Sequence, residues 1–532
     1  MKAGATLANA LWLAGSGAET LRYHRALRQP ESAQLSWLGH QLKRHASSEY
    51  GRRYGFDGIR DYPCFARRIP LTDYAQLAPA IQRIRRGESD VLASGRVTHL
   101  APTSGTTSAS KLIPFTATLQ RSFRAAIAPW LADLARQRPA LLGGPAYWSI
   151  SPQIAAPGES AQPREIPVGY ADDADYLGGA SAWLIRQALA VPGSIRLLQD
   201  VDAFWFLTLL CLLRQPELRM ISVWHPSFLE LLLAAAESRW PELLDAVERG
   251  VHPSAAARSS PELHGLSAMP DPGRAAALGR IGPGNWTRWW PRLQVVSCWG
   301  EQAAEPGWRT LKRELPRVLV QAKGLLATEA VVTLPINDSK PLAVTSHFFE
   351  FLDQRGDVRL AHQLEKGKSY HVVVSNGGGL WRYRLGDQVE CDGHVHATPS
   401  LRFLGRSGRV SDLRGEKLSE ALVYQALQSL WAGTPPPALA MVAACERGRQ
   451  AHYELLICGA QQLGGLQIVA EKLERILCDN PHYALARRLG QLGRLRAREV
   501  APETARNQLL AHQGRLGDAK PHILLTAQDG WQ

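Results

Sequence analysis

Residues 103–111 of this 532-residue chain read Thr103-Ser104-Gly105-Thr106-Thr107-Ser108-Ala109-Ser110-Lys111. This stretch lies between a strand-like run at residues 97–101 and the apolar run Leu112-Ile113-Pro114-Phe115, and the pattern predicts a strand, a loop and then a helix. Backbone N–H groups, hydroxyl groups and one lysine can together bind phosphate oxygens. The stretch is not a Walker loop, because Ser110 stands where that motif has glycine and Leu112 where it has a hydroxyl residue. We interpret it as a phosphate loop; solvated connecting loops share its composition.

A second candidate segment is Gly324-Leu325-Leu326-Ala327-Thr328-Glu329. Thr328 can donate a hydrogen bond to a phosphate. Glu329 can bind Mg²⁺, which prefers oxygen ligands and keeps phosphates in its coordination shell. In isolation, a Thr-Glu pair is more often a surface cap, so the interpretation depends on the neighbouring motifs.

The third candidate segment, Gly379-Leu380-Trp381-Arg382-Tyr383-Arg384-Leu385-Gly386-Asp387, ends in a Gly-Asp turn. An aspartate there can accept hydrogen bonds from ribose hydroxyls, although turns often require aspartate for structural reasons. Further along, Arg406 can pair with nucleotide oxygens, and Lys520 near the end of the chain can act as a mobile cation. Each of the two is, by itself, an ordinary surface charge.

The length predicts two to four domains at about 150 residues each. Hydrophobic residues make up 45% and charged residues 20% of the chain, so the disordered, collagen-like and membrane-embedded classes fit poorly. Strands mingled with helices predict an α/β architecture, and the chain after Arg406 predicts a small α+β domain.

The expected elements follow from hydrophobic periodicity. Leu7, Leu11, Ala14 and Leu21 recur at helical spacing, which favours an N-terminal helix over a signal peptide. The other expected helices are 35–42, 228–236, 240–247, 420–431 and 466–478; the expected strands are 295–299, 318–321, 330–334, 348–352, 370–375, 388–391, 439–444 and 453–459; residues 252–283 read as a loop.

Charge and cysteine content limit the partners. The 61 Lys and Arg exceed the 48 Asp and Glu, for a net charge of +13, but no basic run is interleaved with aromatic residues, so we expect no nucleic-acid partner. The seven scattered cysteines contain no CxxC pair, which argues against disulfides or a zinc site and favours a reducing, cytoplasmic compartment. No apolar run approaches the roughly 18–20 residues of a membrane span, so we expect no stable membrane insertion.

The motifs, taken in this order, resemble those of the adenylate-forming superfamily of acyl ligases. Within it, the chain is most similar to the auxin-responsive acyl acid amido synthetase family (Gretchen Hagen type), particularly its bacterial members. The similarity runs from about Tyr23 onward. It rests on the three segments quoted above together with Ile113-Pro114-Phe115, Val296-Ser297-Cys298-Trp299-Gly300 and Phe349-Glu350-Phe351.

The resemblance implies an adenylate-forming fold: a large N-terminal domain, residues 1–406, with β-barrel and α/β sheet parts, and a small mobile C-terminal domain, residues 407–532. It implies that a carboxylic acid attacks ATP to form an acyl-adenylate and that an amino acid amine then takes the acyl group. The implied ATP contacts are Ser104, Gly105, Thr106, Thr107, Lys111, Gly324, Thr328, Asp387 and Arg406, with Glu329 on Mg²⁺ and Lys520 as the C-terminal catalytic lysine. We expect a monomer.

The acyl pocket is less marked in the sequence. Four aromatic residues lie in segments that can line an apolar pocket, although aromatic residues line cores as well. They are Tyr170, Trp224, Phe228 and Trp299.

Two other functions stay open at this point. An acyl-CoA ligase shares the first half-reaction, and a non-catalytic basic binding protein can retain the fold without the chemistry.

Overall fold

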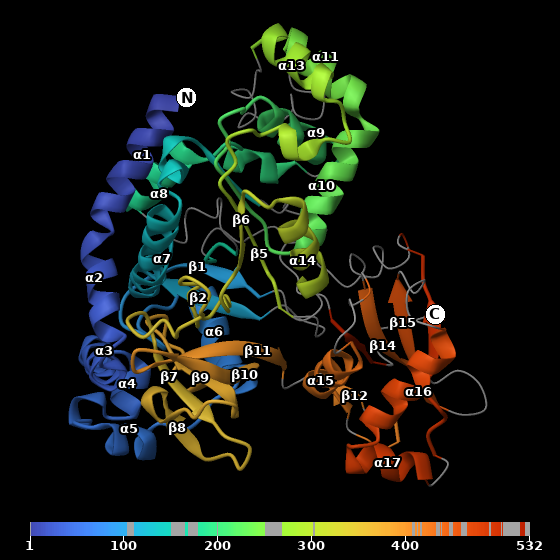
Figure 1. The fold of residues 1–532 in the computed structure, drawn as a ribbon. Coiled ribbons are helices and arrows are strands. Elements are labelled where there is room, and N and C mark those ends of the chain that lie inside the picture. The colour runs from blue at the N-terminus through green and yellow to red at the C-terminus, as the bar shows by residue number, and fades with distance from the viewer. Residues whose placement is uncertain are drawn as a thin grey trace.

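The computed structural model describes residues 2–103, 111–149, 165–168, 179–198, 200–250, 269–301, 304–406, 410–411, 413–414, 416, 418–431, 437, 439–445, 451–458, 465–488, 491–501, 503 and 522–526. It is a mixed α/β structure, as the sequence predicts (Figure 1). Most of the chain forms two layered bodies on the left and top of that view. The chain after Arg406 stands on the right.

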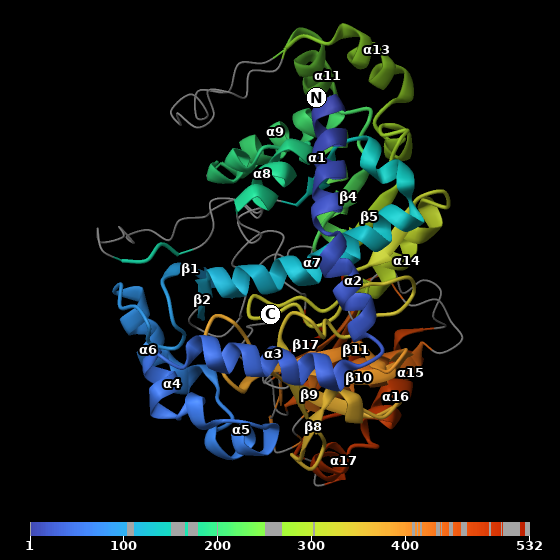
Figure 2. The ribbon, with the colours of Figure 1, turned by 90° about the vertical axis from the view of Figure 1, so that its left-hand side faces the viewer.

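Helices α3, α4 and α5 lie on the lower of these two bodies, whereas α1 and α2 run up its side toward the upper one (Figure 1). Helix α3 begins at Pro30 and buries Trp37, Leu38 and Leu42, which confirms the helix expected at 35–42. Its buried Gln34 donates to the carbonyl of Val344 at 2.7 Å and so fastens the helix to the segment before β7. Figure 2 shows α3 lying across the strands of this body. The helices of this part are α1 Lys2–Gly15, α2 Gly17–Ala26, α3 Pro30–His45, α4 Glu49–Arg53, α5 Tyr62–Arg68, α6 Tyr74–Arg85 and α7 Ala117–Gln137.

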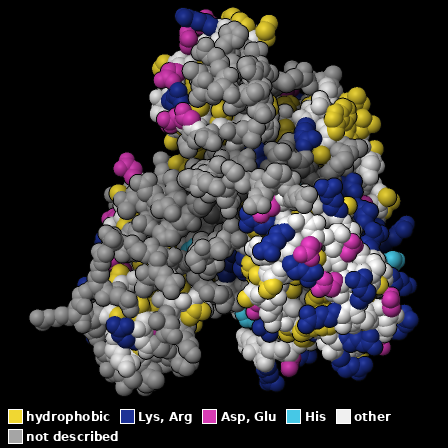
Figure 3. Space-filling model, turned by 180° about the vertical axis from the view of Figure 1, so that it is seen from behind, with side chains coloured by type: hydrophobic (Ala, Val, Ile, Leu, Met, Phe, Trp, Pro, Cys, Tyr) yellow, Lys and Arg dark blue, Asp and Glu magenta, His cyan; other side chains and the backbone are white. Residues whose placement is uncertain are grey.

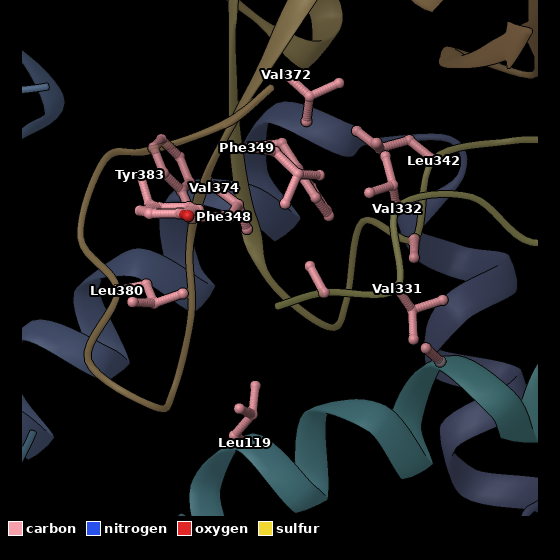
Figure 4. Close-up of a cluster of buried hydrophobic side chains, with 14 of the residues drawn as sticks. Leu119, Val331, Val332, Leu342, Phe348, Phe349, Val372, Val374, Leu380 and Tyr383 are labelled. Atoms are coloured by element: carbon pink, nitrogen blue, oxygen red, sulfur yellow. The ribbon is translucent and has the colours of Figure 1, made fainter. Parts of the chain in front are cut away.

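A five-stranded antiparallel sheet forms the centre of this lower body. Its strand order is β11-β10-β9-β7-β8, and within the described residues β8 and β11 are its two edges. The strands are β7 Phe348–Leu352, β8 Val358–Leu360, β9 Ser369–Ser375, β10 Tyr383–Val395 and β11 Thr398–Arg406. Phe348 and Phe349 pack with Val372 and Val374 in the core (Figure 4).

A four-stranded parallel sheet, in the order β3-β4-β5-β6, forms the upper body. Its strands are β3 Ala146–Trp148, β4 Met220–Ser222, β5 Val295–Cys298 and β6 Leu319–Ala322. The core against this sheet contains side chains from the helices that follow β3 and β4. These helices are α9 Val201–Leu213, α10 Pro226–Ser238, α11 Trp240–Arg249 and α13 Pro272–Ile281. Helix α8 Gly179–Ala188 packs against α1. Helix α14 Glu305–Glu314 lies between β5 and β6 along the chain. Because the strands are parallel, their carboxyl ends share one edge.

The chain after Arg406 has a hydrophobic core of its own, built on α15 and α16 and a mixed sheet in the order β16-β15-β14-β17. The two helices and the β14–β15 pair confirm the elements expected there. The elements are β12 Val410–Ser411, β13 Leu418–Ser419, α15 Glu420–Leu430, β14 Leu439–Cys445, β15 His452–Cys458, α16 Leu466–Leu477, α17 Pro481–Arg488, β16 Arg496–Glu499 and β17 Leu524–Leu525.

The structure corrects the sequence expectation in three places. The apolar run expected to lead into a helix is a strand, β2 Leu112–Thr116, which pairs antiparallel with β1 Val97–Pro102, and helix α7 begins only after it. Residues 330–334 make isolated bridges and no strand. Within the expected loop at 252–283, helix α13 forms because Asp271 caps it and Arg274 donates to buried carbonyls of Leu213 and Trp289.

Two expectations about the surface are addressed by the described residues. None of their helices combines the length and the apolar character that a membrane crossing requires. Seen from behind, most of the visible Lys and Arg side chains lie on the lower right of the view, with Asp and Glu side chains among them (Figure 3). The basic side chains visible there are therefore interspersed with acidic ones.

Candidate functional site

Lys111 lies where the predicted phosphate loop returns to the β1–β2 pair. The N–H of Thr103 donates to the carbonyl of Lys111 at 2.8 Å, and Pro102 pairs with Leu112, so the two ends of residues 104–110 are held together. Tyr74 of α6 accepts a hydrogen bond from the Leu112 N–H at 2.9 Å, and its ring centroid lies 5.8 Å from Lys111 Nζ. Ser104, Gly105, Thr106 and Thr107 lie outside the described residues, so their phosphate contacts stay a prediction.

Glu329 is buried, with an exposed fraction of 4%, in the connection between β6 and β7. The side chain of Asn376 donates to its carbonyl oxygen at 2.8 Å and fixes the backbone there. Burial raises the pKa of the Glu329 carboxyl, Arg406 and Lys111 lower it, and the carboxylate of Asp387 raises it further. Glu329 therefore lies within electrostatic reach of charged residues from three other segments.

Thr328 and Gly324 flank this carboxylate along the same connection. Thr328 is half-buried. Gly324 has a packing reason to be glycine, because a Cβ atom there would lie 2.2 Å from the carbonyl oxygen of Thr333. The structure therefore explains Gly324 by close backbone approach, and its predicted cofactor contact stays untested.

Asp387 and Arg406 face each other across the β10–β11 pair, where the register places them opposite one another. Arg406 Nε donates to Asp387 Oδ1 at 3.2 Å, while Oδ2 of the same carboxylate is buried and accepts no hydrogen bond within the described part of the chain. Asp387 is 1% exposed. The carboxylate of Asp387, and then those of Glu329 and Glu420, raise the pKa of Arg406. A buried acceptor with no partner is suited to a ligand hydroxyl.

One hydrophobic core brings these segments together (Figure 4). Leu119 belongs to α7, which follows β2 and Lys111. Val331 and Val332 follow Glu329, and Tyr383 begins the strand that carries Asp387. Segments more than 200 residues apart, each adjoining one of the three predicted motifs, therefore contribute to one hydrophobic core.

The described residues contain no group of three His, Cys, Asp or Glu side chains arranged to hold a metal ion. Among the described residues, Glu329 therefore belongs to no such group, and the neighbouring carboxylate that acts on it is that of Asp387. Mg²⁺ is commonly bound in proteins through one or two carboxylates together with substrate phosphates and water. The residues present fit Mg²⁺ only when phosphate oxygens complete its coordination.

Lys520 lies outside the described residues, but the segment two residues after it is fixed. The carboxylate of Glu420, at the start of α15, accepts a hydrogen bond from the N–H of Ile523 at 3.0 Å and contacts His522 Nδ1 at 3.1 Å. The carboxylate of Glu420 also contributes to the raised pKa of Arg406.

The four aromatic residues predicted for an acyl pocket have different surroundings. Trp224 and Trp299 follow β4 and β5, and the N–H of Trp299 donates to the carbonyl of Trp224 at 2.7 Å. Phe228 lies in the core with its ring centroid 5.1 Å from that of Trp205. Tyr170 lies outside the described residues. The structure thus joins the backbones of Trp224 and Trp299 at the carboxyl edge of the parallel sheet, and it places the side chains of Phe228 and Trp299 in hydrophobic cores.

Sequence reasoning did not assign a role to Lys323, which lies between two tryptophan rings at this same edge. The available signal was a lysine directly after a buried strand.

Arg382, quoted above only as part of a motif, has a structural role. It pairs with the buried carboxylate of Glu350 at 2.8 Å and donates to the carbonyls of Ala66 and Ile69, which ties α5 to the antiparallel sheet.

Comparisons with known proteins agree with this geometry. The model of the GH3 family N-terminal domain matches residues 21–319, more than half of the chain, and that of the GH3 family central domain matches residues 341–406. The indole-3-acetic acid-amido synthetase GH3.8 of Oryza sativa subsp. indica is 25% identical, with 89% of this chain and 84% of that protein covered.

Two solved structures share the fold. AtGH3.15 acyl acid amido synthetase in complex with 2,4-DB has a TM-score of 0.82 at 20% identity, with 96% of this chain and 94% of that chain covered. A 2-hydroxyisobutyryl-CoA ligase in complex with 2-HIB-AMP has a TM-score of 0.50 at 14% identity, with 93% and 89% covered. The fold is therefore the adenylate-forming fold. The resemblance inferred from the motifs is confirmed: this chain belongs to the GH3 family.

Proposed function

We propose that this protein is an ATP-dependent acyl acid amido synthetase. In the first step a carboxylate oxygen of the acid attacks the α-phosphorus of ATP, and pyrophosphate leaves. In the second step the amine of an amino acid attacks the acyl carbonyl of the adenylate, an amide bond forms, and AMP leaves with the bonding electrons. Support comes from the family and from the amido synthetase names of its relatives.

The observation that carries the proposal is the grouping of Lys111, Glu329, Asp387 and Arg406 around one region. In the proposed complex, Asp387 Oδ2 accepts hydrogen bonds from ribose hydroxyls, and Arg406 holds that carboxylate in place. Lys111 and the hydroxyl groups of Ser104, Thr106 and Thr107 bind phosphate oxygens. These groups place positive charge and hydrogen-bond donors where negative charge develops at phosphorus.

Thr328 donates to the α-phosphate in this proposal, and Glu329 provides the protein ligand to Mg²⁺. When bound, the ion neutralises charge on the phosphates and orients them. Glu329 must be ionised for this role. The raised pKa of its carboxyl keeps a larger protonated fraction in the free protein, and Arg406 and Lys111 oppose that effect.

We further propose that residues 407–532 form a mobile domain that brings Lys520 to the reacting carboxylate. Their separate hydrophobic core supports this division. Closure of such a domain excludes water from a hydrolysable adenylate. The contact of Glu420 with Ile523 fixes the chain just after Lys520 and limits how far that lysine can move from α15.

A cytoplasmic location accompanies this proposal, because the reaction needs ATP and because all seven cysteines are free thiols. We propose that the protein acts as a monomer on small molecules. Light scattering after size-exclusion chromatography tests the oligomeric state, since one chain corresponds to 58.5 kDa.

The deciding experiment is incubation with ATP and Mg²⁺ together with pooled carboxylic acids and amino acids, followed by mass spectrometry for new amides and AMP. A second arm replaces the amino acids with coenzyme A. Amide products support the proposal, and a thioester as the sole product assigns an acyl-CoA ligase instead. Binding to heparin or anionic vesicles without AMP formation in either arm would favour the non-catalytic alternative.

A further inference from the structure

Lys323 lies at the carboxyl edge of the parallel sheet, directly after β6. Its N–H donates to the carbonyl of Cys298 at 2.8 Å, which holds its backbone beside the end of β5. Its Nζ donates to Ser222 Oγ at 2.6 Å and lies 3.4 Å from Ser297 Oγ. Ligands of open α/β sheets commonly bind at the carboxyl ends of the strands.

Two tryptophan side chains flank the ammonium group. Trp130 of α7 has its ring centroid 5.4 Å from Lys323 Nζ, and Trp224 after β4 has its ring centroid at 5.7 Å. The indole N–H of Trp130 donates to Gln321 Oε1 at 2.6 Å, which fixes the orientation of that ring. The surroundings of Lys323 therefore combine one cation and two hydroxyls with two aromatic rings, the residue types that line small-molecule sites.

Lys323 forms no ion pair with the residues that the structure describes. Within the described part of the chain, no carboxylate lies within ion-pair distance of its Nζ, and its polar partners are two neutral serines. Burial lowers the pKa of Lys323 to about 8, so the side chain is still mostly protonated at pH 7. A partly buried charge without a counter-ion is costly, and a bound anion would remove that cost.

This cation is separate from the groups around Glu329. The charged residues that act on Glu329 are Arg406, Asp387 and Lys111, whereas the ionisable group that acts on Lys323 is Cys298. Lys323 precedes Glu329 by six residues in the same connection, so their Cα atoms are at most about 22 Å apart, the length of a fully extended chain. The two residues therefore lie in one connected part of the fold.

Building on the proposed function, we propose that Lys323, Ser222 and Ser297 bind a second anionic group on the acyl acid. The substrates are then carboxylic acids that carry a distal carboxylate or similar anion. The Lys323 ammonium and the hydroxyl hydrogens of the two serines supply three donors that converge on the oxygens of that anion. The reacting carboxylate stays at the other end, near Glu329.

The test compares acids of matched length with and without a second carboxylate. Pimelate is paired with heptanoate, and 4-carboxyphenylacetate with phenylacetate, each in ATP–pyrophosphate exchange with wild type, Lys323→Met and Lys323→Arg. We expect wild type to prefer the diacid by at least about tenfold in kcat/KM. The preference should fall to about one in Lys323→Met and be partly kept in Lys323→Arg.

Lys312→Met is the matched control, because Lys312 also lies against a tryptophan, Trp308, but on the exposed face of α14. It should keep the wild-type preference. The inference is overturned if wild type exchanges with both members of each pair equally, or if Lys323→Met retains the preference.

Equilibrium binding by calorimetry separates this inference from the proposed function. If no acid supports exchange, the proposed function fails, yet pimelate binding that is present in wild type and lost in Lys323→Met would still assign the anion site. Equal pimelate binding by the two proteins would overturn the site whatever the exchange assay shows. Because calorimetry measures binding without turnover, it also tests the site in a Lys323→Met protein that folds but is inactive.

Discussion

Replacing Asp387 with asparagine tests whether the β10–β11 pair binds the nucleotide. Asparagine has nearly the same volume and keeps an oxygen that can accept from Arg406, so the 3.2 Å contact can persist. The substitution removes the negative charge and replaces the buried oxygen Oδ2, which accepts no hydrogen bond from the described residues, with an NH₂ group that cannot accept one. The perturbation is therefore directed at the ligand hydroxyls more than at the pair itself.

The expected magnitude follows from this difference. A hydrogen bond to a charged group contributes roughly 1.5–3 kcal/mol, and about 1.4 kcal/mol corresponds to a factor of ten in affinity. Asp387→Asn should accordingly raise the KM for ATP by roughly 10- to 100-fold. The KM for the acid should change little, because the acid does not contact this side chain in the proposed complex.

The assay is ATP–pyrophosphate exchange at varied ATP and saturating acid, with thermal unfolding of each variant measured in parallel. Asp392→Asn is the matched control, since Asp392 lies on the same strand but is exposed. The reasoning is refuted if Asp387→Asn keeps the wild-type KM for ATP while its melting temperature is unchanged. An equal rise in the KM for ATP and for the acid would mean that the substitution distorts the whole site.

Three further predictions use the same protein. Glu329→Gln should lower the rate of pyrophosphate exchange by at least about tenfold and weaken the dependence of that rate on Mg²⁺ concentration. Glu365→Gln, at an exposed position, should change neither. An unchanged Mg²⁺ dependence in Glu329→Gln would remove Glu329 from the metal site. Arg382→Met breaks a buried ion pair and should cost roughly 3–5 kcal/mol in urea unfolding, while Arg359→Met, at an exposed pair, should show no comparable loss. Burial lowers the pKa of Lys323 to about 8, and the side chain is charged below that value. The preference for diacids should therefore be present at pH 7 and disappear as the pH rises through about 8. A preference that stays constant up to pH 10 would contradict the assignment.

Much of the fold could be predicted from local sequence. The helix at α3 and the strand at β5 follow from periodicity and from continuous apolar runs, and both formed as expected. The errors occurred where tertiary contacts outweigh local pattern. Residues 330–334 are apolar enough for a strand. The backbone before them turns tightly, however, because the backbone groups of Ala327 and Ala330 hydrogen-bond to each other. Within the described residues, the segment makes isolated bridges and has no continuous partner strand.

The candidate site could be predicted only in part. Glu329 and Asp387 stand in short motifs, so their positions were readable from the chain itself. Lys323 was not assigned, because its partners Ser222 and Ser297 lie about 101 and 26 residues away on neighbouring strands. Nothing local to any of the three residues indicates that they meet.

The family, the order of the predicted motifs and the residue types that carry the proposed chemistry could be read from the amino-acid sequence, because each motif is a short continuous stretch. Which charges act on one another depends on the tertiary structure. Parallel pairing of β4, β5 and β6 sets Lys323 beside two serines, and antiparallel pairing of β10 and β11 sets Arg406 on Asp387. Electrostatic interaction depends on distance in space, and burial makes it strong, so neither arrangement could be read from separation along the chain.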